Sequence, residues 1–161
     1  MKNAYVVYTE TISNKNQIEE EKARKEQERI TILNNNSEFF CETVIAPMIE
    51  EYSKEGHSSC RLYFKWDYWT KAYLHISDKI YWLKNTQRGY HELPVKTKGH
   101  IDINKIISIL NEFDYQTKLA TETIWLASSR TGKNGSNENI YCLDISWEKD
   151  LSNKTVIIIE H

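Results

Sequence analysis

Residues 60–76 read CRLYFKWDYWTKAYLHI, and this stretch decides the fold. Apolar and polar side chains alternate in 60–66 and again in 70–76, a period of two that predicts two β-strands. The segment Asp67-Tyr68-Trp69 between them predicts a turn that would pair Phe64 with Ala72. In that register the polar side chains of both strands share one face of a β-hairpin.

The polar face of this predicted hairpin would present basic and aromatic groups together. Its six residues are Arg61, Tyr63, Lys65, Lys71, Tyr73 and His75. Tyr and Arg dominate the energetics of protein interfaces, so we expect a binding site for a protein partner. Cations also neutralise phosphate, and rings stack on bases at about 1–3 kcal/mol each, so a nucleotide or single-stranded nucleic acid is the alternative. The same composition also fits a hairpin face that is simply solvated, or one that the N-terminal helix covers. In either case the face would bind no ligand.

Upstream of the hairpin the pattern predicts helices. Residues 5–8 are expected to form a short strand, and 14–33 a helix whose middle, 19–29, is almost wholly charged. The run 34–37 (Asn-Asn-Asn-Ser) predicts a break. A second helix is expected over 38–54, with a kink or a restart near Ala46 because Pro47 lacks a backbone N–H.

Downstream, Asp102 is expected to cap a helix whose apolar residues recur at i, i+3, i+4 and i+7. Further strands are predicted over 79–83, 121–127, 140–147 and 155–159. These elements together predict one α+β domain spanning 1–161. It would consist of an antiparallel sheet packed by helices, with a charged N-terminal helix.

Composition narrows the class of protein. The chain has 161 residues, a net charge of −2 and 27% charged residues, which is typical of a folded domain. No stretch resembles a membrane span or a signal peptide, so we expect a cytoplasmic protein that does not enter membranes. The three cysteines, Cys41, Cys60 and Cys142, are expected to be free buried thiols.

Motifs for catalysis and for cofactors are missing from the sequence. It carries no Walker A loop, no Gly-rich dinucleotide turn and no paired metal-ligand spacing. We therefore expect no enzyme activity, no cofactor and no metal. One enzymatic alternative rests on His57 and His75, which each begin a His-x-Ser pattern; two-histidine phosphodiesterases use such a pair as acid and base across a phosphate.

A family resemblance spans roughly residues 38–147. It is carried by a helix that ends in KEGHSS (54–59), by LNEFDYQTK (110–118) and by LDISW (143–147). This layout resembles small α+β proteins encoded by phages and prophages of Gram-positive bacteria. Known members include inhibitors of host defences, such as anti-CRISPR proteins. The motifs that carry the resemblance belong to the structural framework, so the resemblance assigns no functional residue.

Together these features predict a non-enzymatic binding protein. The resemblance implies a phage-type inhibitor that blocks a bacterial defence protein such as a CRISPR nuclease, in the cytoplasm of the host cell. Three alternatives are kept beside this prediction: a homodimer, a protein that binds a nucleotide or single-stranded nucleic acid, and a two-histidine phosphodiesterase.

Overall fold

The computed structural model describes residues 1–76, 99–127 and 135–148. Its first three elements form a nearly continuous helical rod: α1 (Ala4–Phe40), η1 (Cys41–Ile45) and α2 (Ala46–Lys54). A further helix, α4 (Ile103–Glu112), follows later in the chain. Its strands are β1 (Ser59–Asp67), β2 (Ala72–Ile76), β3 (Gln116–Ala127) and β4 (Gly135–Ser146). The predicted α+β class is confirmed.

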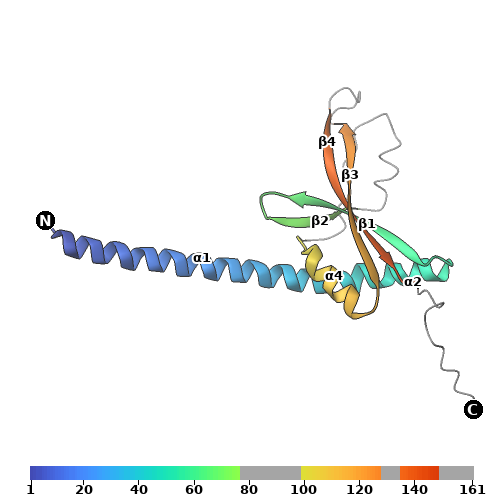
Figure 1. Cartoon of the computed structure of the whole chain (residues 1–161), viewed down its shortest axis with the longest axis horizontal. Helices are drawn as coiled ribbons and strands as arrows, with labels where there is room; N and C mark the ends of the chain where they lie inside the picture. The colour runs from blue at the N-terminus through green and yellow to red at the C-terminus, as the bar shows by residue number, and fades with distance from the viewer. Residues whose placement is uncertain (77–98, 128–134, 149–161) are drawn as a thin grey trace, which may run out of the picture.

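The four strands form one antiparallel sheet in the order β2-β1-β4-β3. The strands cross above the C-terminal part of the rod, and α4 lies beside it (Figure 1). The N-terminal part of α1 projects far beyond the sheet and lies beside none of the other described elements (Figure 1). Every residue from 1 to 28 is exposed.

The main core lies between the sheet and the helices. It joins the inward side of the rod with one face of β1 and β4 and with the apolar stripe of α4. Its fully buried members include Phe40, Ile45, Leu62, Phe64, Ile106 and Leu143. A second, smaller cluster on the opposite face of the sheet consists of Tyr63, Ile76, Ile140 and Cys142.

The N-terminus of α1 corrects the predicted strand at residues 5–8. The backbone of Asn3 is extended, and its side-chain oxygen accepts a hydrogen bond from the backbone N–H of Val6. This N-cap satisfies one of the backbone donors that a helix start leaves unpaired. The run Tyr5–Tyr8 therefore begins a helix, although its β-branched and aromatic residues favour strands.

The predicted break at 34–37 is also wrong, and tertiary contacts explain why. The Asn36 side-chain nitrogen donates to the carbonyl of His100, and the Ser37 hydroxyl accepts from the backbone N–H of Asp102. Asn and Ser weaken helices because they compete for backbone groups nearby. Here they bind the segment that leads into α4, so the helix continues.

The irregularity expected near Pro47 is present as a π-helical turn. In η1 the N–H of Ala46 reaches the carbonyl of Cys41, five residues back. This wider turn ends just before Pro47, which falls in the first turn of α2, where a missing donor is tolerated. Gly56 follows α2 with a φ of 87°, as expected for a residue that ends a helix.

Other predicted elements have mixed outcomes. Asp102 caps α4 as expected, with its carboxylate accepting from the N–H of Asn104. The strand predicted over 121–127 lies within β3, and the one predicted over 140–147 lies within β4 except for Trp147, which follows its end. The strands predicted over 79–83 and 155–159 lie outside the described residues. None of the described helices is both long enough and apolar enough to cross a membrane.

The three cysteines are buried thiols that form no disulfide, as predicted. Burial raises the pKa of Cys41 and of Cys60 to about 11 each, with nearby carboxylates adding to the effect. Since the thiolate is the reactive form, we expect the native thiols to react with iodoacetamide at pH 8 far more slowly than the same thiols in guanidinium. Mass spectrometry of the alkylated protein measures this; rapid native labelling of any of them would contradict the burial.

Candidate protein-binding turn between β1 and β2

The observed hairpin register differs from the predicted one. Phe64 pairs with His75, whereas Ala72 pairs with Asp67. The partner of Phe64 is thus three residues further along β2 than expected, and an odd shift exchanges the two faces of a strand. The six residues predicted to share one face are therefore divided, which corrects that prediction.

The three predicted residues on β1 lie on the face away from the helices. Arg61 forms ion pairs with Asp144 of β4 and Glu122 of β3, and the hydrogen bonds that it donates to the Asp144 carboxylate are the main reason that its pKa is raised. Tyr63 is buried in the smaller apolar cluster. Lys65 is partly buried opposite Leu74 and Ile140.

The two predicted residues on β2 lie on the helix-covered face. His75 is buried, with the rings of Phe40 and Phe64 centred 4.9 and 5.6 Å away. Tyr73 packs edge-on against Trp66 and Tyr141, and burial raises its pKa. These rings are already occupied by neighbours, so they do not offer a stacking platform for bases.

The sixth predicted residue, Lys71, belongs to the turn itself. Its backbone has a φ of 51°, which is uncommon for a residue with a side chain. The turn spans residues 68–71 between the paired Asp67 and Ala72. It therefore contains one more residue than the three-residue turn predicted from the sequence.

Two large aromatic side chains project from this turn into solvent. Trp69 is 96% exposed and Tyr68 is 83% exposed. The ring of Tyr68 meets Trp66 edge-on, with centroids 6.5 Å apart. Trp and Tyr are among the side chains that most often dominate protein interfaces.

Asp67 fixes the conformation of the turn. Its carboxylate accepts hydrogen bonds from the backbone N–H of Trp69 at 3.0 Å and from the Thr70 hydroxyl at 2.9 Å. It also contacts the Nε2 of His100 at 2.7 Å. These contacts, the bond from Trp69 first, hold the pKa of the Asp67 carboxyl below its usual value, so Asp67 stays ionised and keeps the turn closed at neutral pH.

The rod supports the turn from the other side. One terminal nitrogen of Arg29 in α1 donates to the carbonyls of Thr70 and Lys71, at 3.4 and 3.5 Å. Next to the turn, Tyr73 exchanges two backbone hydrogen bonds with Ile101. The exposed aromatic rings are thus carried by a loop that is tied to α1, to β2 and to the segment before α4.

A cavity of ≈ 320 Å³ opens beside the turn. Its lining includes the cations Arg29 and Lys71 and the rings of Trp66 and Tyr73. The charges are balanced, however, because Glu26 binds Arg29 through two oxygens and lies close to Lys71, while Asp102 also lines the wall. A phosphate would find little uncompensated positive charge there.

The two histidines proposed as a catalytic pair are not brought together. His57 precedes β1 and is exposed beside Glu55, whereas His75 is opposite Phe64. The five residue-to-residue steps from Ser59 to Phe64 alone span about 17 Å of strand. With His75 also buried in the core, the two rings do not flank a common phosphate.

Within residues 1–76, 99–127 and 135–148, no three His, Cys, Asp or Glu side chains gather to hold a metal ion. The chain matches no protein-family model, no curated protein and no solved structure. The case for function therefore depends on the geometry of the chain itself.

The sequence placed the candidate site on this hairpin, but the six predicted residues did not include Tyr68 and Trp69. A signal was present, since Asp at the start of a turn commonly binds a backbone N–H two residues later. That pattern in Asp67-Tyr68-Trp69 predicts a fixed turn with two aromatic side chains at its tip.

Proposed function

We propose that this chain is a non-enzymatic protein-binding protein that contacts its partner through Tyr68 and Trp69. The observation that carries the proposal is a 96% exposed Trp on a turn held in place by Asp67. Exposing an indole to water is unfavourable, and a partner with an apolar pocket would relieve that cost. Because the turn is fixed beforehand, little conformational entropy is lost on binding.

Nucleotide or nucleic-acid binding is less well supported. It depended on a common face of basic and aromatic residues, and the hairpin register divides that face. Inhibition of a bacterial defence protein by a phage product remains the specific role that fits a small non-enzymatic binder. That role stays a prediction from the sequence resemblance.

A comparison of variants in a bacterial lysate tests the proposal. We expect the wild-type chain to retain a protein partner after nuclease treatment and Trp69→Ala to lose it, with affinity for the purified partner falling about 30-fold or more, as for an interface hot spot. Phe113→Ala removes a similarly exposed ring from the end of α4 and should bind like wild type. Equal retention by wild type and Trp69→Ala, or loss of all binding with nuclease, would contradict the proposal.

A further inference from the structure

Another cavity, of ≈ 360 Å³, lies between the rod and the C-terminal end of α4. Its floor consists of buried apolar side chains that also belong to the main core, among them Ile45, Ile49 and Leu110. Sites for small organic ligands are commonly apolar clefts of about 300–1,000 Å³ in which a few polar groups orient the ligand. This rod–α4 cavity therefore has the size and the lining of a ligand site.

The π-helical turn η1 shapes the rod–α4 cavity. Cys41, Glu42 and Ile45 of η1 all line it, and so does Ala46, which follows directly. Turns of this kind are rare and frequently occur at functional sites. The side chain of Ala46 ends at its Cβ, so the rod leaves open space beside the core at this point.

The opening of the cavity is negatively charged. Glu38 and Glu42 line it and are exposed, and no Lys, Arg or His is found among the described residues that line it. Glu38 has a partner in Lys105, 3.4 Å away. Burial first, and then the charges of Glu42 and Glu38, raise the pKa of the Cys41 thiol to about 11. The negative potential thus reaches the cavity wall, where it favours a cation.

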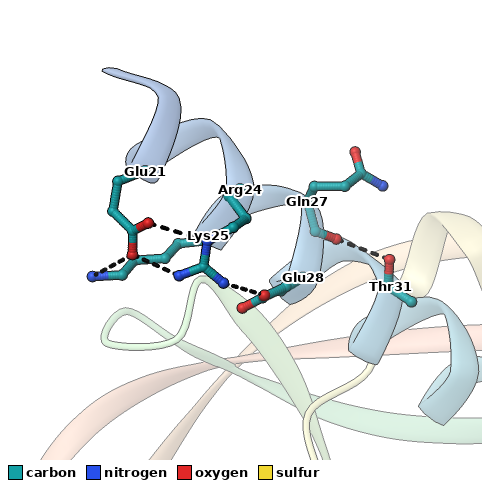
Figure 2. A network of polar contacts seen from close by, with 6 residues as sticks. All are labelled: Glu21, Arg24, Lys25, Gln27, Glu28 and Thr31. Atoms are coloured by element: carbon teal, nitrogen blue, oxygen red, sulfur yellow. Dashed lines mark hydrogen bonds and ion pairs between the residues drawn. The ribbon is translucent and has the colours of Figure 1, made fainter. Parts of the chain in front are cut away.

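Glu42 differs from the carboxylates in the middle of α1. There, Arg24 pairs with both Glu21 and Glu28, and Lys25 also pairs with Glu21 (Figure 2). Pairs of this kind need a cation three or four residues away along the helix. The positions at that spacing from Glu42 hold Glu38, Phe39, Ile45 and Ala46. Within the described part of the chain Glu42 has no ion-pair partner, so a bound ligand could supply the cation.

Two aromatic rings also line the cavity. Phe113 is 71% exposed, whereas Tyr115 is partly buried against the main core. The face of an aromatic ring attracts an ammonium group that lies within about 6 Å of its centre. The carboxylate of Glu42 and the exposed ring of Phe113 therefore favour the same kind of ligand group.

We propose that the rod–α4 cavity binds a small organic ammonium ion that carries an apolar chain or ring. The apolar part lies on Ile45, Ile49 and Leu110, and the ammonium group donates hydrogen bonds to the carboxylate of Glu42. This site shares no residue with Tyr68 or Trp69, so it stands independently of the proposed function.

Isothermal titration calorimetry of the full chain with octylammonium, octanol and octanoate tests the proposal. We expect octylammonium to bind with a Kd below about 1 mM, as for a ligand of this size, and at least about fivefold more tightly than octanol. Water solvates the ammonium group better than the hydroxyl, so a purely apolar cavity would favour octanol instead. Octanol or octanoate binding as tightly as octylammonium, or no measurable binding of octylammonium, would overturn the proposal.

Variants of the cavity locate the site. Glu42→Gln should weaken the binding of octylammonium about five- to tenfold and leave that of octanol unchanged. Ala46→Phe should block both ligands by filling the cavity, and since Ala46 is exposed the thermal midpoint should not fall. Glu19→Gln makes the same change of charge on the exposed part of α1 and should bind like wild type. Equal effects of Glu19→Gln and Glu42→Gln, or full binding by Ala46→Phe, would contradict the assignment.

A last comparison separates this site from the β1–β2 turn. Trp69→Ala should bind octylammonium like wild type, whether or not it loses a protein partner. Glu42→Gln and Ala46→Phe should both retain the partner captured from a nuclease-treated lysate. Loss of that partner from both cavity variants, with their thermal midpoints unchanged, would show that the cavity receives a protein and would overturn the proposal of a small ligand.

Discussion

Phe40→Ala is expected to destabilise the body of the protein by about 3–5 kcal/mol, the usual cost of removing a buried aromatic ring. Phe40 is 2% exposed. Its ring is centred 6.1 Å from that of Phe64 in β1 and 4.9 Å from that of His75 in β2. It therefore joins the helical rod to both strands of the hairpin, and alanine would leave a cavity that they cannot easily close.

Urea denaturation followed by tryptophan fluorescence measures this loss. The matched control is Phe113→Ala, whose ring is 71% exposed and whose removal should change the free energy of unfolding by less than about 0.5 kcal/mol. If the two variants unfold at the same urea concentration, the rod does not pack on the sheet through Phe40.

Glu20→Pro is expected to unfold the first part of α1 and leave the body intact. An interior proline costs a helix about 3 kcal/mol because it removes a hydrogen bond and clashes with the preceding turn. The part of α1 before that turn, residues 4–16, would have to form a helix alone, and helices shorter than about 12–15 residues are marginal in water. No buried contact supports it, because residues 1–28 are all exposed.

Far-ultraviolet circular dichroism should show the loss of roughly three helical turns, while the cooperative unfolding of dilute protein keeps its midpoint. Glu20→Ala, which retains the backbone donor, should preserve both signals. A Glu20→Pro variant whose body melts at a clearly lower temperature would show that the arm contributes to the core, contrary to the fold described.

Elements with strong local signals could be predicted from sequence. Asp102 before an apolar repeat identified α4, because capping and amphipathic burial favour the same helix. Alternation identified β1 and β2, because one face of each strand packs in the core. In these segments local preference and tertiary packing agree.

The remaining differences arise where distant contacts override local preference. Asn36 and Ser37 remain helical because His100 and Asp102 provide partners for them. The hairpin register depended on whether the turn had three or four residues, and alternation alone is satisfied by either length. Because the observed turn has four residues, His75 and Tyr73 lie on the opposite face of the sheet from Arg61 and Tyr63.

The candidate site proposed from the structure overlaps the one predicted from the sequence only in part. The hairpin and Lys71 were identified from their composition, whereas the exposure of Trp69 results from contacts made by Asp67 with Thr70 and His100. His100 is 33 residues from Asp67 along the chain. A contact of that kind leaves no periodic pattern in a single sequence.

Site-specific photo-cross-linking tests the central claim most directly. With Trp69 replaced by benzoylphenylalanine, irradiation in a nuclease-treated bacterial lysate should give one dominant covalent protein adduct, because the side chain at this position enters the partner. The same replacement at Phe113, also exposed, should give little of it. An adduct formed from position 113 and not from position 69, or no protein adduct from position 69, would contradict the assignment of the β1–β2 turn as the protein-binding site.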